Sequence, residues 1–191
     1  MSEIKIPCGI SNRHIHVSKD DLETLFGKGY SLSPKKDLSQ TGQFACEETV
    51  KLVTPKGQIE NVRILGPERN STQVEISVTD SFTLGIRAPY RESGDTSGTP
   101  GVLIVGPAGF KYIPEGVIIP LRHIHMDPQT AVKLEVQDKE IVSVETEGPR
   151  SVIFNNVMIR IRGDFMLDFH IDTDEANAAG LNNSSFVRIL R

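Results

Sequence analysis

The chain has 191 residues, is 38% hydrophobic and 24% charged, and carries a formal net charge of -4. This composition is typical of a folded globular protein and excludes an intrinsically disordered one, and the acidic balance, with no basic cluster longer than Lys35-Lys36, excludes a nucleic-acid binder. Because there is no apolar run of about 18 residues and no signal-peptide core at the N-terminus, we expect a cytoplasmic protein that does not span a membrane.

Histidine is the most informative residue type in this chain. Four of the five histidines lie in two copies of the tetrapeptide Arg-His-Ile-His, which contribute His14 and His16 near the N-terminus and His123 and His125 in the second half. In an extended segment, side chains at i and i+2 point to the same face, so each copy can present two imidazoles to one metal ion. A single His-x-His is often an accident of a strand, but a duplicated one favours a zinc site.

Each tetrapeptide runs directly into a helix start. Ser18 and Asp127 are good N-cap residues, and Pro128 adds a proline at the first helical position. We therefore predict helices over residues 19–26, ending at the glycines that follow, and over residues 128–134.

Alternating β-branched residues predict antiparallel strands in both halves. The first half has segments 48–54 and 59–64, and the second has segments 140–146 and 152–161, with a turn containing proline and glycine between the members of each pair. The two strand pairs resemble each other in sequence. The chain is therefore predicted to contain an internal duplication.

The spacing of the two copies is not uniform. Asn61-Val62 and Asn156-Val157 lie 95 residues apart, whereas the tetrapeptides lie 109 residues apart. The first half therefore has 14 additional residues, which we place between Val17 and Thr49.

At the separation of 95, Glu75 in the first half corresponds to His170 in the second. Each is flanked by apolar residues in a predicted strand. Three protein ligands with an open fourth position is the arrangement of a catalytic zinc ion, and imidazole and carboxylate ligands suit zinc. The sequence predicts two such groups: His14, His16 and Glu75 in the first half, and His123, His125 and His170 in the second.

Several of these residues have plainer interpretations. Glu75 can belong to the polar face of an alternating strand, and Arg13 and Arg122 either pair with nearby carboxylates or contact a substrate. Cys8 and Cys46 are expected to be small buried hydrophobic residues rather than a disulfide, and Cys46 is the better candidate nucleophile of the two.

The predicted fold is mainly β, with two pseudo-symmetric small β-barrels that arise from the duplication and with short helices. We place the first half at residues 1–89 and the second at residues 110–191, with exchange of strands between the halves left open. Residues 90–109, rich in Gly, Ser and Pro, are expected to connect them and match neither a P-loop nor a dinucleotide-binding motif.

The duplicated Arg-His-Ile-His, residues 41–45 (Thr-Gly-Gln-Phe-Ala), residues 66–69 (Gly-Pro-Glu-Arg) and the acidic segment 168–177 together resemble the PduL-type phosphate propanoyltransferase (phosphotransacylase) family. The resemblance spans nearly the whole chain. It implies two β-barrels related by pseudo-symmetry with an active site between them, and the reversible conversion of acyl-CoA and phosphate to acyl phosphate and CoA. The expected acyl group is propanoyl or acetyl.

The resemblance also implies roles for individual residues. The two groups of three ligands would each hold one zinc ion, CoA would be the co-substrate, and Arg69 would clamp the phosphate. A guanidinium suits that role because an anionic substrate needs local positive charge in an acidic chain. The further substrate-binding residues that it suggests are Ser11, Gln40, Gln43, Ser93 and Asn177.

The family resemblance also bears on partners and location. Members housed in bacterial microcompartments usually carry an N-terminal extension that forms a targeting helix, whereas only Met1 to Ile6 precede the region of resemblance here. This favours a free cytosolic form over association with a microcompartment shell, which stays open as the alternative. Strand-rich edges and the resemblance suggest a homo-oligomer, with acyl-CoA, CoA and phosphate as partners and with neither nucleic acid nor a membrane.

Three alternatives remain open at this point. The reaction can use a covalent acyl intermediate on Cys46 in place of direct attack by phosphate. The same ligands can serve a dinuclear zinc hydrolase of phosphoesters, which needs no CoA. A non-enzymatic barrel protein can use its histidines to bind structural zinc.

Overall fold

The computed structural model describes residues 4–190, and the chain forms two compact units. Unit 1 comprises the N-terminal residues up to Ser11, the short segment Ser39–Thr41 and the C-terminal part from Leu121 onward, and unit 2 comprises Asn12–Leu38 and Gly42–Pro120. No helix among the described residues is long and apolar enough to cross a membrane.

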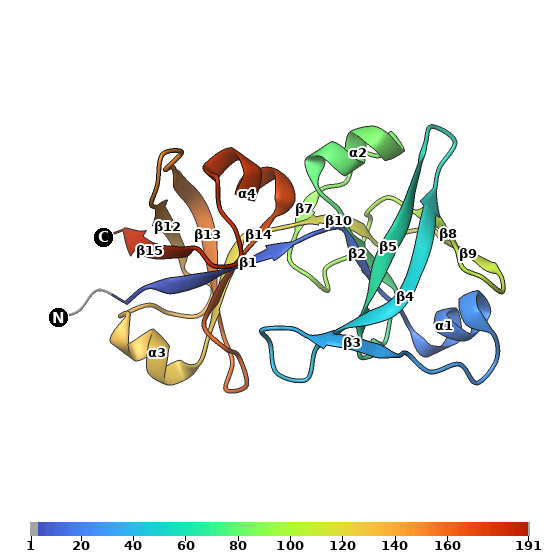
Figure 1. Cartoon of the computed structure of the whole chain (residues 1–191), viewed down its shortest axis with the longest axis horizontal. Helices are drawn as coiled ribbons and strands as arrows, with labels where there is room; N and C mark the ends of the chain where they lie inside the picture. The colour runs from blue at the N-terminus through green and yellow to red at the C-terminus, as the bar shows by residue number, and fades with distance from the viewer. Residues whose placement is uncertain (1–3, 191) are drawn as a thin grey trace. The chain divides into compact units, whose positions relative to one another are not determined.

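Unit 1 is a closed β-barrel. Its strands are β1 (Ile6–Ser11), β11 (His123–Met126), β12 (Ile141–Thr146), β13 (Ile153–Ile161), β14 (Asp168–Asp172) and β15 (Phe186–Leu190). They close in the order β1-β14-β11-β13-β12-β15. β1 pairs in parallel with β14 and antiparallel with β15, so that the blue start of the chain lies beside its red end in Figure 1. The buried core of this unit includes Ile6, Ile124, Ile159 and Phe169.

Unit 2 is a larger sheet with a core of its own. Its strands are β2 (His14–His16), β3 (Pro34–Asp37), β4 (Phe44–Val53), β5 (Gln58–Gly66), β6 (Gln73–Glu75), β7 (Tyr90–Arg91), β8 (Val102–Val105), β9 (Phe110–Ile113) and β10 (Val117–Pro120). The order across the sheet is β7-β10-β6-β2-β5-β4-β8-β9, and β3 pairs with β4. The long hairpin of β4 and β5 is strongly twisted (Figure 1), and Ile15, Leu52 and Ile64 are fully buried in this core.

The helices are short, and two of them begin at the predicted caps. The helices are α1 (Lys19–Phe26), α2 (Val78–Leu84), α3 (Pro128–Lys133) and α4 (Thr173–Ala179). The Ser18 side chain accepts a hydrogen bond from the backbone N–H of Asp21 at the start of α1, and Asp127 accepts from two N–H groups of α3. The predictions of a helix after each tetrapeptide and of a mainly β fold are confirmed.

The internal duplication is visible in the strand register. β2 pairs in parallel with β5 and antiparallel with β6, and β11 pairs in the same two ways with β13 and β14. The equivalent residues Asn61 and Asn156 both adopt positive φ, 57° and 58°. Residues that lie 95 positions apart in the two repeats therefore share backbone conformation as well as sequence. The additional residues of the first half include β3.

The strand before each tetrapeptide belongs to the opposite repeat. In β1, Cys8 lies opposite Phe169 of β14, whereas in β10 the equivalent Val117 lies opposite Val74 of β6. The N-terminal strand of the chain thus completes the barrel formed by the C-terminal residues. Each tetrapeptide begins where the chain leaves one unit and enters the other.

Candidate metal centres and active-site residues

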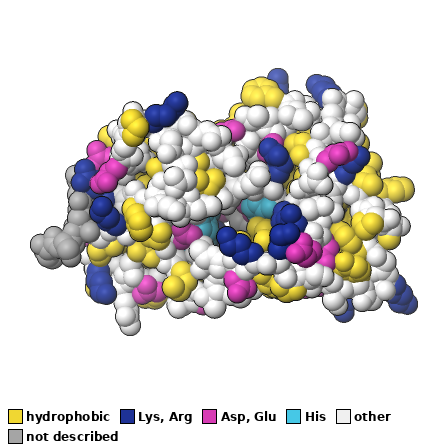
Figure 2. Space-filling view, viewed as in Figure 1, with side chains coloured by type: hydrophobic (Ala, Val, Ile, Leu, Met, Phe, Trp, Pro, Cys, Tyr) yellow, Lys and Arg dark blue, Asp and Glu magenta, His cyan; other side chains and the backbone are white. Residues whose placement is uncertain are grey.

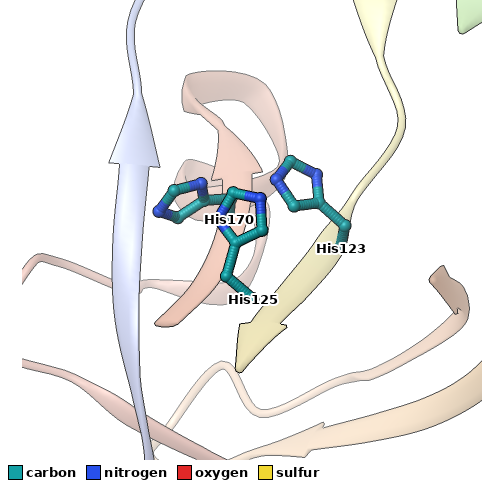
Figure 3. A group of neighbouring side chains, drawn as sticks. All are labelled: His123, His125 and His170. Carbon is teal, nitrogen blue, oxygen red and sulfur yellow. The ribbon is translucent and has the colours of Figure 1, made fainter. Parts of the chain in front are cut away.

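The histidine group of unit 1 is built from two neighbouring antiparallel strands. His123 and His125 stand on β11, and His170 stands on β14 directly opposite His123. Figure 3 shows the three rings turned toward one another. One ligand atom from each residue lies within 4.8 Å of the others. The structure therefore brings together the three ligands predicted for the second half.

The ring nitrogens of unit 1 provide a test of whether a metal ion fits. His123 donates from Nδ1 to the carbonyl oxygen of Leu121 at 2.7 Å, and a neutral ring that donates from Nδ1 keeps a lone pair on Nε2 for a metal. Both ring nitrogens of the buried His125 lack any hydrogen-bond partner. A buried unpaired imidazole is costly, and a metal ion would satisfy it.

The charge state of His125 agrees with that role. Burial, followed by the neighbouring His123 and His170, lowers its pKa to about 2. His125 is therefore neutral at physiological pH, as a metal-binding imidazole must be.

The group of unit 2 has the same design with one carboxylate. His14 and His16 stand on β2, and Glu75 stands on β6 opposite His14. His14 Nε2 lies 3.3 Å from Glu75 Oε2, and His16 Nε2 lies 3.8 Å from Oε1. Both histidines use Nδ1 toward a backbone carbonyl, that of Asn12 at 2.8 Å and that of Leu65 at 3.2 Å. Both Nε2 atoms are thus directed at one carboxylate, as in a metal site.

All three residues of the unit 2 group are at most 7% exposed, and Figure 2 shows imidazole groups only as small cyan areas enclosed by other side chains. Burial alone would raise the pKa of Glu75, but the charge and hydrogen bond of His14 lower it well below its usual value. Burial opposes charge on His14 as well, yet Glu75 raises its pKa, whereas burial lowers the pKa of His16 to about 3. Glu75 thus favours a proton on His14, and a cation bound between the carboxylate and the two imidazoles would compete with that proton.

Arg69 and Ser93 adjoin the unit 2 group. Arg69 donates from Nη1 to Ser93 Oγ at 3.1 Å, and Ser93 donates to Glu75 Oε1 at 2.7 Å. Arg69 also lowers the pKa values of His14 and His16, although less than the leading causes do. The structure therefore links two of the sequence-predicted residues, Arg69 and Ser93, to the three ligands.

The other four suggested residues have different surroundings. Gln40 is buried and exchanges two hydrogen bonds with the backbone of Met166 in unit 1. Ser11 ends β1 opposite Asp172, Gln43 accepts at its carbonyl from Leu38 N–H, and the side chain of Asn177 is exposed on α4. Their contact with a substrate stays a prediction.

The arginines of the two tetrapeptides pair with carboxylates at equivalent positions. Arg13 Nε lies 2.8 Å from Asp80 Oδ1, and Arg122 Nε lies 2.9 Å from Glu175 Oε1. Asp80 and Glu175 are the third residues of α2 and α4 and complete their capping boxes. Each arginine therefore ties the His-x-His strand to the helix that follows the strand of the third ligand.

The two cysteines are buried and free, as predicted. Burial raises the pKa of Cys46 to about 11 and that of Cys8 to about 12. A thiol that stays protonated in an apolar core is a poor nucleophile, so the environment of Cys46 argues against the covalent alternative.

Three residues around the metal groups were missed from sequence. Gln73 and Asp168 each stand two positions before a third ligand and contact it, and Gly9 lies opposite His170 in the adjacent strand. Their equivalent positions in the duplication could have drawn attention to Gln73 and Asp168. Their residue types differ, however, so the repeat does not display them as a motif.

Comparison with known proteins agrees with this geometry. The family model of phosphate propanoyltransferase matches residues 7–182. A phosphate propanoyltransferase of Thermotoga maritima is 59% identical over 95% of this chain and 87% of its own length, and one of Salmonella typhimurium is 54% identical over 100% and 91%. One of Rhodobacter capsulatus is 50% identical over 96% and 86%.

These relatives are acyltransferases by name, and they match this chain over nearly its whole length. The protein is therefore an acyltransferase. The chain belongs to the phosphate propanoyltransferase family.

Proposed function

We propose that the protein is a phosphotransacylase that transfers a propanoyl or acetyl group reversibly between CoA and inorganic phosphate. One observation carries this proposal: a chain that the phosphate propanoyltransferase family matches over residues 7–182 gathers each predicted set of three ligands within 4.8 Å. The relatives bear the name of this reaction, and the acidic chain places Arg69 beside one of the ligand groups.

We infer that each group of three ligands holds one zinc ion. The unpaired nitrogens of His125 and the approach of two Nε2 atoms to Glu75 support this, because imidazole and carboxylate are preferred zinc ligands. A bound zinc ion would supply Lewis-acid polarisation of a carbonyl or phosphate oxygen.

Arg69 is the residue proposed to bind phosphate. Its planar guanidinium can donate two parallel hydrogen bonds to phosphate oxygens, which a lysine cannot do. Ser93 Oγ accepts a hydrogen bond from Arg69 Nη1 and donates one to Glu75 Oε1, so the guanidinium is held beside a proposed metal ligand. This arrangement would hold the attacking phosphate in a defined orientation next to the thioester.

The leaving group makes few demands on the protein. A thiol with a pKa near that of cysteine, about 8.5, leaves as a thiolate without a strong acid. All five histidines of the chain lie in the two ligand groups, so none is left to serve as the base of a serine or cysteine nucleophile. The proposed reaction is therefore direct attack of phosphate on the acyl-CoA carbonyl.

The test is to measure CoA release from acetyl-CoA and propanoyl-CoA with and without phosphate, before and after chelation, together with zinc content. We expect release that requires phosphate, about two zinc ions per chain, a loss of more than about 100-fold on chelation, and recovery on addition of zinc. Release without phosphate, or full activity after complete metal removal, would contradict the proposal. Consumption of a phosphoester in the absence of CoA would instead favour the hydrolase.

A further inference from the structure

The residue two positions before each third ligand differs between the repeats. In β6, Gln73 precedes Glu75 and lies opposite His16, whereas in β14, Asp168 precedes His170 and lies opposite His125 in the equivalent register. Both residues are buried. The two positions are therefore structurally the same, but one carries an amide and the other a carboxylate.

Each of these side chains contacts the third ligand of its own unit. Gln73 donates from Nε2 to Glu75 Oε1 at 2.6 Å. In the other repeat, His170 Nε2 lies 2.9 Å from Asp168 Oδ2, closer than the 3.5 Å that separates it from Ser39 Oγ. A carboxylate ligand can only accept hydrogen bonds, whereas an imidazole bound to metal through one nitrogen donates from the other. The polarity of each contact thus matches the ligand beside it.

The side of the ring that faces Asp168 can be identified. A Cβ atom on Gly9 of β1 would lie 2.9 Å from His170 Nε2, so this nitrogen is on the side of β1. In Figure 3 the other ring nitrogen of His170 is directed toward the rings of His123 and His125. One ring nitrogen of His170 thus contacts Asp168, and the other is left for a metal ion.

The residue that lies opposite the third ligand on the neighbouring strand also differs between the repeats. A Cβ atom on Gly9 would come within 2.6 Å of His170 Cδ2 and 2.7 Å of Asp168 Oδ2, so any larger residue would displace the pair. At the equivalent position of β10, opposite Glu75, stands the buried Ile118. Glycine thus leaves room for the imidazole and carboxylate in unit 1, whereas isoleucine occupies the equivalent position in unit 2.

Each group of three ligands, taken together with the residue that contacts its third ligand, contains one carboxylate. In unit 2 the carboxylate is a ligand, Glu75, and its partner Gln73 is neutral. In unit 1 all three ligands are imidazoles, and the carboxylate of Asp168 stands behind one of them. A divalent cation in either group is therefore accompanied by one carboxylate, which offsets part of the cost of burying its charge.

We propose that Gln73 and Asp168 are positioning residues that orient the third ligand of each metal group, and that ligand, partner and opposing residue form two interchangeable sets: Glu75, Gln73 and Ile118, and His170, Asp168 and Gly9. This rests on the proposed binding of zinc by both groups. It predicts that either ligand works only with the partner of its own set.

The test exchanges the ligand and its partner within unit 1 of the full-length chain and leaves Gly9 unchanged. In a background in which His16→Ala disables the unit 2 group, zinc affinity is measured by chelator competition, and cobalt(II) is used as a spectroscopic probe of the ligand field. The variants are Asp168→Gln, His170→Glu and the double exchange, with Asp164→Asn on the exposed surface of the same unit as the matched control.

We expect Asp168→Gln to weaken zinc binding about 10- to 100-fold, the usual effect of losing such a partner. His170→Glu should be worse because two carboxylates then face each other, and adding Asp168→Gln to it should restore binding by at least about tenfold. Asp168→Asn, which keeps an acceptor oxygen at the original side-chain length, should lose less affinity than Asp168→Gln and shift the cobalt spectrum only slightly.

Two results would overturn the proposal: zinc affinity of the folded Asp168→Gln variant within twofold of its background, or a double exchange no better than His170→Glu alone. Failure of the proposed function is distinguishable from these. If the unaltered protein binds no zinc, both inferences fall, whereas two bound zinc ions without phosphate-dependent CoA release would remove only the proposed reaction.

Discussion

The guanidinium of Arg69, which we propose to bind phosphate, is connected through Ser93 to Glu75 of the unit 2 group. Arg69→Ala should raise the KM for phosphate by roughly 10- to 150-fold, the loss expected for hydrogen bonds to a charged group, with a much smaller change in the KM for acyl-CoA. Arg69→Lys keeps the charge but loses the paired donors, so it should fall in between. Steady-state kinetics with each substrate varied in turn measure this separation.

The control for this experiment is Lys35→Ala, which removes one positive charge from an exposed ion pair with Glu47 and should leave both KM values unchanged. An equal rise in both KM values for Arg69→Ala would show that Arg69 does not bind phosphate selectively.

Cys46 offers a second prediction for a single residue. With its pKa raised to about 11 by burial, roughly one molecule in a thousand carries a thiolate at pH 8, compared with about a quarter for an ordinary thiol. Cys46→Ala should therefore retain activity within about twofold, and alkylation of the native protein should be slow at both cysteines. A folded Cys46→Ala protein that loses more than about 100-fold of its activity would revive the covalent route, with Cys8→Ala as the matched control.

The two groups of three candidate ligands could be predicted from sequence, whereas the residues that contact them could not. The four tetrapeptide histidines are recognisable because the motif is repeated, and Glu75 was found because His170 occupies the equivalent position. Gln73 and Asp168 share a position but not a residue type, because Gln73 donates a hydrogen bond to a carboxylate and Asp168 accepts one from an imidazole. Gly9 was missed because a close side-chain approach leaves no local sequence signal.

At the level of secondary structure, the ion pairs of the tetrapeptide arginines hold strands and helices together. Asp80 is buried and accepts from both Arg13 and the backbone N–H of Ser77. Arg13→Gln leaves this carboxylate without its cation and should destabilise the metal-free protein by about 1–3 kcal/mol. Denaturant unfolding measures the change, and a double-mutant cycle with Asp80→Asn isolates the pairwise contribution.

The equivalent pair of Arg122 and Glu175 is the internal comparison, since its carboxylate is more exposed than that of Asp80. Arg122→Gln should cost less than Arg13→Gln. If Arg13→Gln changed the free energy of unfolding by less than about 0.5 kcal/mol, the pair would be an incidental surface contact.

Helix starts were easier to predict than strand partners. Ser18 and Asp127 signal their helices locally, because a cap needs only the N–H groups two or three residues away, and α1 spans the predicted residues 19–26. Strands 48–54 and 140–146 were recognised by alternation, but their full lengths depend on neighbours. β4, for example, begins at Phe44, where it pairs with β3.

The connectivity of the whole molecule could not be deduced from local pattern. The equivalent strands β1 and β10 are both extended and largely apolar, and their sequences do not indicate which repeat each strand joins. The pairing that the structure adopts sets Gly9 opposite His170 and Ile118 opposite Glu75, and a Cβ atom on Gly9 would meet His170 and Asp168. Each unit is thus completed by a strand from the other half of the sequence.

This exchange predicts how the chain can be divided. A fragment of residues 121–190 contains every barrel strand except β1, so β14 and β15 would have unpaired edges and Phe169 would lose part of its packing. Because β1 runs antiparallel to β15, with Ile6 opposite Val187, a short Gly/Ser linker can join residue 190 to residues 4–11. We expect the fragment alone to be unfolded, and the linked form to unfold cooperatively and to bind one zinc ion, as measured by circular dichroism and metal analysis.

Cooperative folding of residues 121–190 alone would show that β1 is dispensable. Replacing Gly9 by Val in the linked form should abolish zinc binding, because the added side chain meets His170 and Asp168.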